Sequence, residues 1–237
     1  MDKISIITLG CKVNQYESEA LLFALKKANF DVVTKLELAD IYIINSCAVT
    51  NEAEHKSREQ ISKILKLNPK AKIYVCGCSS QAHPDSFLNK PNVECVIGTE
   101  NKLKLIDAII KNKKGNLQIP ISSTYCDTYS AEPTRTRGTI KIQDGCNNFC
   151  SYCIIPYTRG RERSRTIESI EKEVARLSSL TSELVLVGIN IASYGKDLSP
   201  KKSLVDVVNI FKKYPNLRLR FSSFEMGTIS EELLKEL

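Results

Sequence analysis

The chain has 237 residues, a length that fits one large domain or two smaller ones. Apolar residues make up 42% and charged residues 26%, values that are ordinary for a folded chain with a buried core. No stretch approaches the roughly 20 apolar residues that a membrane span needs, which excludes a transmembrane protein. The net charge of +7 makes an acidic partner plausible, and nucleic acid is one candidate.

The role expected for the nine cysteines depends on the cellular compartment of the protein, which the N-terminal sequence indicates. The opening residues MDKISIITLGCKVN lack a basic region, a long apolar run and a small-residue cleavage site, so we expect a cytoplasmic protein. In a reducing cytosol, clustered thiols are metal ligands or catalytic groups more often than disulfides. An odd number of cysteines also fits poorly with complete pairing.

The first part of the chain alternates between strand-like apolar runs and segments with helical periodicity. Such alternation predicts an open, mostly parallel sheet that helices cover on both faces. The expected elements, in chain order, are strand Lys3–Leu9, helix Gln15–Asn29, strand Ile41–Asn45, helix Thr50–Leu67, strands Lys72–Cys76 and Val93–Ile97, and helix Lys102–Lys111.

The segment Asn112–Arg137 breaks this pattern and is rich in Lys, Gly, Ser, Thr and Pro. We interpret it as a linker with one short strand, Leu117–Ile121. This division predicts an N-terminal α/β domain over residues 1–112, a linker over 113–137 and a second domain over 138–237.

Strand and helix patterns alternate again after the linker. Three strand–helix units cannot close a barrel, so the second part is either an open sheet or part of a longer protein, and we favour the latter. The expected elements are strand Thr139–Gln143, helix Ile167–Leu180, strand Leu184–Val187, helix Leu204–Tyr214, strand Leu217–Phe221 and a helix from Ile229.

Three closely spaced cysteines, Cys146, Cys150 and Cys153, follow the first strand of this second part. Cysteine is the usual ligand of iron–sulfur clusters, and a site with three protein ligands leaves one position free for a substrate or cofactor. A zinc site and incidental buried thiols are the alternatives. The spacing, with Tyr152 just before the third cysteine, matches the cluster motif of the radical S-adenosylmethionine superfamily.

A second set of three cysteines is spread along the first part of the chain. Cys11, Cys47 and Cys78 each come two residues after a predicted strand. The carboxyl ends of parallel strands share one edge of a sheet, so the fold brings these thiols together and a second cluster is predicted. Two other cysteines, Cys76 and Cys95, fall inside strand patterns and are interpreted as core residues. We assign no role to the last cysteine, at position 126.

The segments TLGCKVNQYES, INSCAVT, CGC and DGCNNFCSYCIIPYTRGRERSR together closely resemble the tRNA methylthiotransferases. This resemblance covers the whole chain, and two cysteine triads in this order are specific to few radical enzymes. The opening TLGCKVN resembles the branch that acts on N6-threonylcarbamoyladenosine at tRNA position 37.

The resemblance implies a flavodoxin-like N-terminal domain, a radical S-adenosylmethionine (β/α) barrel that is incomplete here, and a C-terminal RNA-binding β-barrel that is absent. It implies two [4Fe-4S] clusters, one on each triad, and two molecules of S-adenosylmethionine for each product. One molecule provides the methyl group, and the other provides the radical that abstracts hydrogen from carbon 2 of the adenine. The implied partners are the anticodon stem-loop of a tRNA and an electron donor, with no membrane.

The resemblance also suggests contacts to S-adenosylmethionine. Tyr152 belongs to the cluster motif, while LVGINIASYG and FSSFEMG look like the cofactor-contacting segments of the family. Two departures concern these segments: position 189 is isoleucine where glutamine is common, and position 226 is methionine where proline is common. The remaining candidates for cofactor contact are Asn190, Ser222 and Glu225.

Four arginines, Arg159, Arg161, Arg163 and Arg165, alternate after the second triad. In an extended segment alternate residues share a face, so they predict a basic ridge beside the cluster. Arginine pairs well with phosphate, and Tyr157 is placed to stack on a base, so we expect the ridge to contact the tRNA backbone. The alternatives are a solvated charged segment and partial contact with the cofactor.

The sequence therefore supports three candidate functions. The leading one is methylthiolation of threonylcarbamoyladenosine in tRNA. The second is another radical reaction, with isopentenyladenosine tRNA or a ribosomal protein as substrate. The third is a metal-stabilised nucleic-acid-binding protein without catalysis. We expect a chain of this length to be weakly active or inactive, because an incomplete barrel leaves the site open to water and a sheet edge unpaired.

Overall fold

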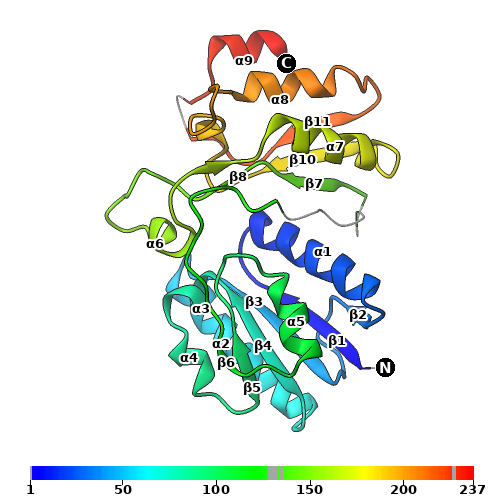
Figure 1. Ribbon diagram of the computed structural model, residues 1–237, viewed down its shortest axis with the longest axis vertical. Helices are drawn as coiled ribbons and strands as arrows, with labels where there is room; N and C mark the ends of the chain where they lie inside the picture. The colour runs from blue at the N-terminus through cyan, green and yellow to red at the C-terminus, as the bar shows by residue number, and fades with distance from the viewer. Residues whose placement is uncertain (1, 128–132, 134–135, 226–227) are drawn as a thin grey trace.

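A six-stranded parallel sheet forms the first half of the molecule in the computed structural model, which describes residues 2–127, 133, 136–225 and 228–237 (Figure 1). The strand order is β2-β1-β3-β4-β5-β6. Residue 226, one of the two departures from the family pattern, lies outside the described residues. The strands are β1 Lys3–Thr8, β2 Asp31–Val33, β3 Ile41–Ser46, β4 Lys72–Gly77, β5 Val93–Val96 and β6 Gly115–Asn116.

Helices cover both faces of this sheet because successive strand residues point to opposite sides. Ile43 of β3 packs into the core beneath α1 and α5, whereas Ile44 packs into the core beneath α2 and α4. Thr50 caps α2 by accepting a hydrogen bond from the backbone N–H of Ala53. The helices are α1 Lys12–Lys27, α2 Asn51–Leu67, α3 Cys78–Ala82, α4 Asp85–Leu88 and α5 Lys104–Ile110.

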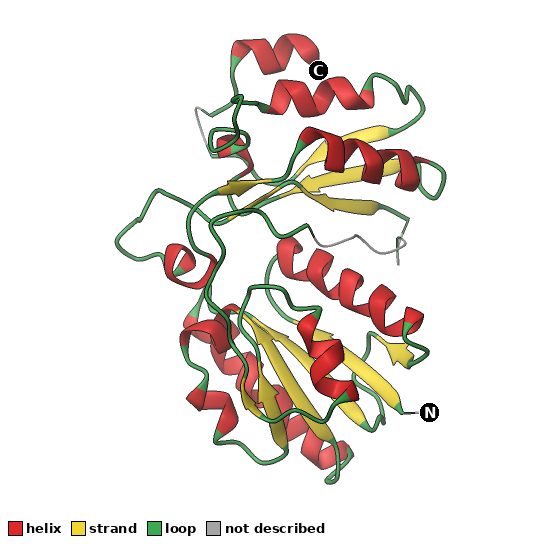
Figure 2. Ribbon diagram, in the orientation of Figure 1, coloured by secondary structure: helices red, strands yellow, loops and turns green. Residues whose placement is uncertain are grey.

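The second half has a three-stranded parallel sheet in the order β11-β10-β7, with a short antiparallel pair, β8 and β9, beside it (Figure 2). The strands are β7 Gly138–Lys141, β8 Gln143–Asp144, β9 Arg163–Ser164, β10 Glu183–Val187 and β11 Arg218–Phe221. The helices are α6 Ile155–Arg159, α7 Ile167–Ser178, the 3₁₀ helix η1 Ile191–Ser193, α8 Leu204–Phe211 and α9 Glu231–Glu236.

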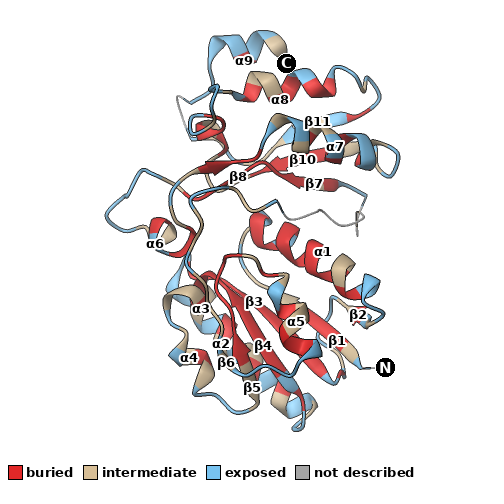
Figure 3. Cartoon of the chain, viewed as in Figure 1, coloured by how far each residue is buried: buried red, intermediate tan, exposed pale blue. Residues whose placement is uncertain are grey.

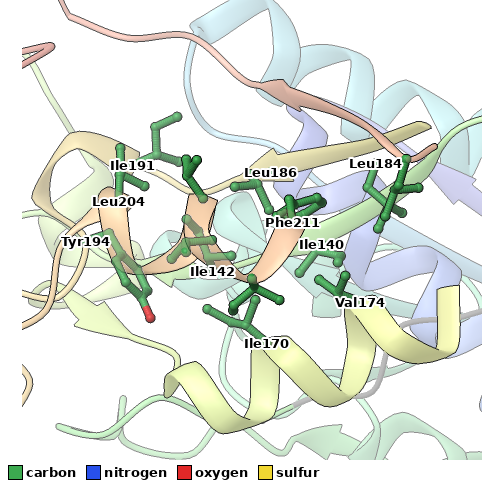
Figure 4. Packing of buried hydrophobic residues seen from close by; sticks show 14 of the residues in the cluster. Ile140, Ile142, Ile170, Val174, Leu184, Leu186, Ile191, Tyr194, Leu204 and Phe211 are labelled. Atoms are coloured by element: carbon green, nitrogen blue, oxygen red, sulfur yellow. The ribbon is translucent and has the colours of Figure 1, made fainter. Parts of the chain in front are cut away.

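One face of the small sheet packs under α7 and α8. Ile140 and Leu186 from the strands meet Ile170, Val174 and Phe211 from the helices in a continuous apolar core (Figure 4). These side chains are almost completely buried, so the burial of this apolar surface stabilises the second half.

The other face of the small sheet packs against the N-terminal half. Val185 and Val187 of β10 contact Val13 and Tyr16 of α1, so α1 lies between the two sheets (Figure 1). Figure 3 shows the face of α1 in this position as largely buried. The N-terminal half therefore covers the side of the small sheet that would face the interior of a (β/α) barrel.

The α/β fold class with a parallel N-terminal sheet is confirmed, whereas the strand expected at Leu117–Ile121 is wrong. The sheet ends instead with β6, whose two residues pair with β5 just before that segment. This pairing carries the first sheet past the expected boundary at residue 112. In the described part of the chain, seven elements of two to five residues were not predicted, because they are too short to show a periodic pattern: β2, α3, α4, β6, α6, β9 and η1.

Candidate metal centres

The fold brings Cys11, Cys47 and Cys78 to one edge of the large sheet. Cys11 is the N-cap of α1 after β1, Cys47 directly follows β3, and Cys78 opens α3 after β4. The strands β1, β3 and β4 are neighbours and run in parallel, so their carboxyl ends lie side by side. Cys47 and Cys78 are buried, and Cys11 is half-buried.

The Cys47 thiol is affected by both other cysteines of this triad. Burial raises its pKa, the sulfurs of Cys78 and Cys11 add to this rise, and a backbone N–H and Arg159 oppose it. Gly10 leaves room for this arrangement, since a Cβ atom at that position would lie 2.5 Å from the Sγ of Cys47. Gly10 also has a φ of +91°, a conformation that side chains with a Cβ rarely adopt.

The case for a cluster at this edge rests on the chemistry of the donors, since cysteine thiolates are the usual ligands of iron–sulfur clusters. Within the described ranges, no three histidine, cysteine, aspartate or glutamate side chains are grouped so that they could hold a metal ion. Beside Cys78, the Ser79 hydroxyl is fully buried and has no hydrogen-bond partner within the described part of the chain. Such an orphaned donor is what a bound polar group would satisfy.

The second triad lies in the loop between β8 and α6. The N–H of Cys146 donates to the carbonyl of Gly160 at 3.1 Å, and the N–H of Cys153 donates to the carbonyl of Cys150 at 2.9 Å. Gly145 precedes the loop with a φ of +70°, and a Cβ there would lie 1.9 Å from the Arg161 carbonyl oxygen. The loop is thus folded onto its own return segment, with Cys150 exposed.

A buried glutamine joins this loop to the end of β10. The Oε1 atom of Gln143 accepts a hydrogen bond from the N–H of Asn190 at 2.8 Å. Its Nε2 atom donates to the carbonyls of Asp144 at 2.9 Å and Gly145 at 2.8 Å. Gln143 therefore fixes the cysteine loop beside the segment expected to contact S-adenosylmethionine.

The four expected cofactor contacts differ in their position. Asn190 follows β10 and Ser222 follows β11, so both lie at the carboxyl edge of the small sheet. The chain also leaves β7 at this edge before it forms the cysteine loop. Glu225 lies further along the same exit segment and is exposed. Tyr152, inside the cysteine loop, is 90% exposed. Their contacts to the cofactor stay predictions.

A buried network of charges connects the two halves beside the N-terminal triad. Glu17 of α1 pairs with Lys102 at 2.5 Å, with Lys141 at 2.7 Å and with Arg159 at 2.8 Å. Asp144 pairs with Lys141 at 2.6 Å and with Arg159 at 3.2 Å. Burial raises the pKa of the Asp144 carboxyl, but Lys141 and Arg159 outweigh this effect and lower the pKa to about 2. Asp144 is therefore ionised at neutral pH.

The exposed basic ridge expected after the second triad is wrong for three of its four arginines. Arg159, Arg163 and Arg165 are at most 3% exposed. Arg163 pairs with Glu100 at 2.9 Å, and Arg165 pairs with Glu173. Burying a cation requires a paired anion, and here partners distant in the sequence supply it. These three arginines cannot reach a phosphate in this structure.

Only Arg161 of the four is exposed, and it forms a small aromatic and basic patch with Phe149 and Tyr157. Its guanidinium lies 4.3 Å from the centre of the Phe149 ring. The Phe149 and Tyr157 rings meet edge to face at 5.9 Å, and Tyr157 is 72% exposed. The patch therefore presents a cation and two aromatic rings to solvent beside the cysteine loop.

Sequence reasoning missed the carboxylates and the lysines of the network. One signal was present: Glu17 falls four residues before Leu21 and eight before Leu25, on the apolar face of the first helix. A charged residue on a buried stripe indicates a buried partner. The interpretation of Cys76 and Cys95 as core residues is confirmed, since both are fully buried, and burial raises the pKa of Cys76 to about 12.

Two family models match the chain, one over each half. Residues 3–98 match the family described as "Uncharacterized protein family UPF0004", and residues 140–237 match the radical SAM superfamily. In the described residues, none of the helices has the length and apolar character needed to cross a membrane.

The chain is also similar to curated proteins over nearly its whole length. It is 35% identical to the threonylcarbamoyladenosine tRNA methylthiotransferase MtaB of Bacillus subtilis, over 100% of this chain and 54% of that protein. The identity to the MtaB protein of Thermotoga maritima is 38%, over 99% of this chain and 55% of the relative. A tRNA-2-methylthio-N(6)-dimethylallyladenosine synthase of Fervidobacterium nodosum is 36% identical over 91% of this chain and 51% of its own length.

The chain therefore spans about half the length of the curated relatives it matches. The two family models occur in the same order as the two cysteine triads, and each model contains one triad. Together with these relatives, this arrangement shows that the chain belongs to the tRNA methylthiotransferase family.

Proposed function

We propose that this chain carries the two cluster-binding units of an enzyme that adds a methylthio group to carbon 2 of N6-threonylcarbamoyladenosine at tRNA position 37. The observation that carries the proposal is the pair of cysteine triads, which the fold gathers at strand ends of two packed α/β units. The names of the MtaB relatives support the choice of substrate. Relatives named for dimethylallyladenosine make that nucleoside the second candidate.

The residues of each triad have separate tasks in this proposal. Cys146, Cys150 and Cys153 would hold the [4Fe-4S] cluster of the radical superfamily, and Cys11, Cys47 and Cys78 would hold a second one. When bound, the two clusters and S-adenosylmethionine supply the radical chemistry and the methylthio group. The protein supplies binding and orientation: Gln143 holds the cysteine loop, and α1 shields the inner face of the small sheet from water.

The position of the N-terminal half is consistent with both clusters serving one substrate. Arg159 lies six residues beyond Cys153, and its Nε atom is 3.3 Å from the Sγ of Cys78. One side chain thus joins the segment after the second triad to a member of the first. A nucleoside bound at the carboxyl edge of the small sheet would therefore lie near both triads.

The principal test is the nucleoside content of tRNA from cells that lack this gene. Mass spectrometry should show the loss of the methylthio form and the accumulation of N6-threonylcarbamoyladenosine. Accumulation of dimethylallyladenosine instead would identify the second candidate substrate. An unchanged set of nucleosides would contradict both tRNA assignments, and iron and sulfide analysis of the purified protein would then test the non-catalytic alternative.

Alanine variants of one cysteine in each triad test the cluster assignment directly. The chain purified without oxygen should contain roughly eight irons if both triads hold [4Fe-4S] clusters. Cys47→Ala and Cys150→Ala should each reduce this to about half, because each removes a ligand of a different cluster. Cys95→Ala provides the control, since Cys95 is a core residue outside both triads. Iron loads and visible absorbance that stay unchanged in the first two variants would refute the assignment.

The patch formed by Phe149, Tyr157 and Arg161 replaces the expected ridge as the candidate contact to tRNA. Aromatic rings stack on unpaired bases, and arginine adds charge pairing with phosphate. Arg161→Glu should therefore weaken the binding of an anticodon stem-loop by roughly ten-fold or more at low salt. Lys66→Glu on α2 makes the same charge change at an exposed site remote from the cysteine loop. Fluorescence anisotropy that gives equal losses for both variants would argue against the patch.

A further inference from the structure

One buried side chain, Arg159, contacts the N-terminal triad from the other half of the molecule. Its Nε–H donates to the Sγ of Cys78 at 3.3 Å. Arg159 is the last residue of α6, the helix that follows the loop of the second triad. The contact therefore links the two triads through the folded chain rather than through solvent.

The guanidinium of Arg159 is fixed on every side. Its Nη1 atom donates to Glu17 at 2.8 Å and to Asp144 at 3.2 Å. Its Nη2 atom donates to Asn14 at 2.7 Å and to Glu17 at 3.0 Å. All three nitrogens have partners and the side chain is 0% exposed, so rotation away from Cys78 would break several buried hydrogen bonds.

A fixed donor beside a cysteine sulfur has a defined effect on an iron–sulfur cluster. Hydrogen bonds to the ligand sulfurs and nearby positive charge are among the factors that set the reduction potential of such clusters. Both stabilise the more negative, reduced form, because they interact with the electron density on sulfur. An arginine held in this way should therefore raise the potential of a cluster bound by Cys78.

We propose that Arg159 is a positioning residue that holds Cys78 and raises the reduction potential of the N-terminal cluster. This inference rests on the proposed function, because it takes Cys78 as a ligand of that cluster. It adds a role for a residue outside both cysteine triads. It also means that a displacement of α6, which lies next to the second triad, would move Arg159 relative to Cys78 of the first triad.

A purely structural role for Arg159 makes a different prediction. Neutralising Glu17 and Asp144 requires only a cation, which lysine also provides. Lysine, however, lacks the fixed fork that places an N–H on the sulfur while it binds two carboxylates. Arg159→Lys should therefore keep most of the folding stability and lose the hydrogen bond to Cys78.

The test measures a potential rather than an activity. The whole chain with Cys146, Cys150 and Cys153 replaced by alanine isolates the N-terminal cluster, which is titrated with dithionite and followed by electron paramagnetic resonance. Arg159→Lys should shift the midpoint to lower potential, and Arg159→Gln should shift it further if that variant folds. The matched control is Arg165→Lys, which changes a buried arginine of the same segment that pairs with Glu173 of α7.

Each outcome of this test bears on the role of Arg159, on the proposed function, or on both. A lower potential in Arg159→Lys, with the parent value kept in Arg165→Lys, supports the inference. A potential unchanged in Arg159→Lys, or shifted equally in both variants, overturns the inference and leaves the proposed function intact. A parent protein that binds no iron at the N-terminal triad overturns the inference and the second cluster together.

Discussion

Replacing Glu17 with alanine is expected to destabilise the chain by about 3–5 kcal/mol, the cost typical of breaking a buried ion pair from one side. Glu17 is 6% exposed and faces Lys102, Lys141 and Arg159. Alanine at this position removes the anion that all three cations share, and Asp144 alone cannot neutralise them. Urea unfolding followed by circular dichroism gives the free energy of unfolding.

Glu52→Ala is the matched control for this measurement. Glu52 pairs with Lys56 at 2.6 Å, a distance similar to those of Glu17, but its side chain is 76% exposed. Exposed pairs of this kind contribute little because water and salt screen them, so the control should differ little from the parent. A loss of stability in Glu17→Ala no larger than in the control would mean that the buried network does not stabilise the contact between the halves.

The effect of Glu17→Ala should also depend on pH. Burial raises the pKa of Glu17, but Arg159, Lys102 and Lys141 outweigh it and hold the pKa well below its usual range. The stabilisation is therefore fully present above the pKa of an unfolded glutamate, about 4.3. It is lost as the pH falls through the lower pKa of the folded state, so the difference between parent and variant should shrink in acid.

The positions of the cysteines could be predicted from the sequence because they depend on a local rule. Cys47 and Cys78 follow apolar runs that read as buried strands, and parallel strands end at one edge whatever the details of packing. The same reasoning placed the loop of Cys146 after the strand segment that the structure divides into β7 and β8. Loops at strand ends thus reveal candidate ligands even when their separation in sequence is large.

The arginines could not be predicted in this way because their environment depends on distant residues. The hydrogen bond between Arg159 and Glu17 joins positions separated by 142 residues. Alternating charges look like a solvated or ligand-binding face unless the opposing carboxylates are known. The burial of these arginines is a property of the assembled tertiary structure, and their own alternating spacing does not indicate it.

The packing of α1 between the two sheets connects these observations. The same helix begins at Cys11, carries Glu17 into the charge network and places Tyr16 against β10. A movement of the small sheet relative to α1 would therefore disturb the apolar contact, the ion pairs and the first triad together. This coupling makes the contact between the halves part of the site rather than a passive interface.

Replacing Gly10 with alanine is expected to remove the N-terminal cluster while leaving the chain folded. The new Cβ would lie 2.5 Å from the Sγ and 2.7 Å from the Cβ of Cys47, so the ligand must move. The φ of +91° adds strain of about 1–2 kcal/mol for any residue with a Cβ. Iron analysis should show a loss of about half the iron, equal to the loss in Cys47→Ala.

Gly115→Ala separates the clash at Gly10 from backbone strain. Gly115 has a similar φ of +89°, but a Cβ there would meet nothing within 4 Å. Both variants therefore pay a similar conformational cost, whereas only Gly10→Ala pushes against a cysteine of the first triad. We expect Gly115→Ala to lower the melting temperature slightly and to keep its full iron content. Equal iron contents in the two variants would show that the Cys47 side chain can move away from residue 10 without loss of the metal. The close packing of Cys47 against Gly10 would then not be needed for iron binding.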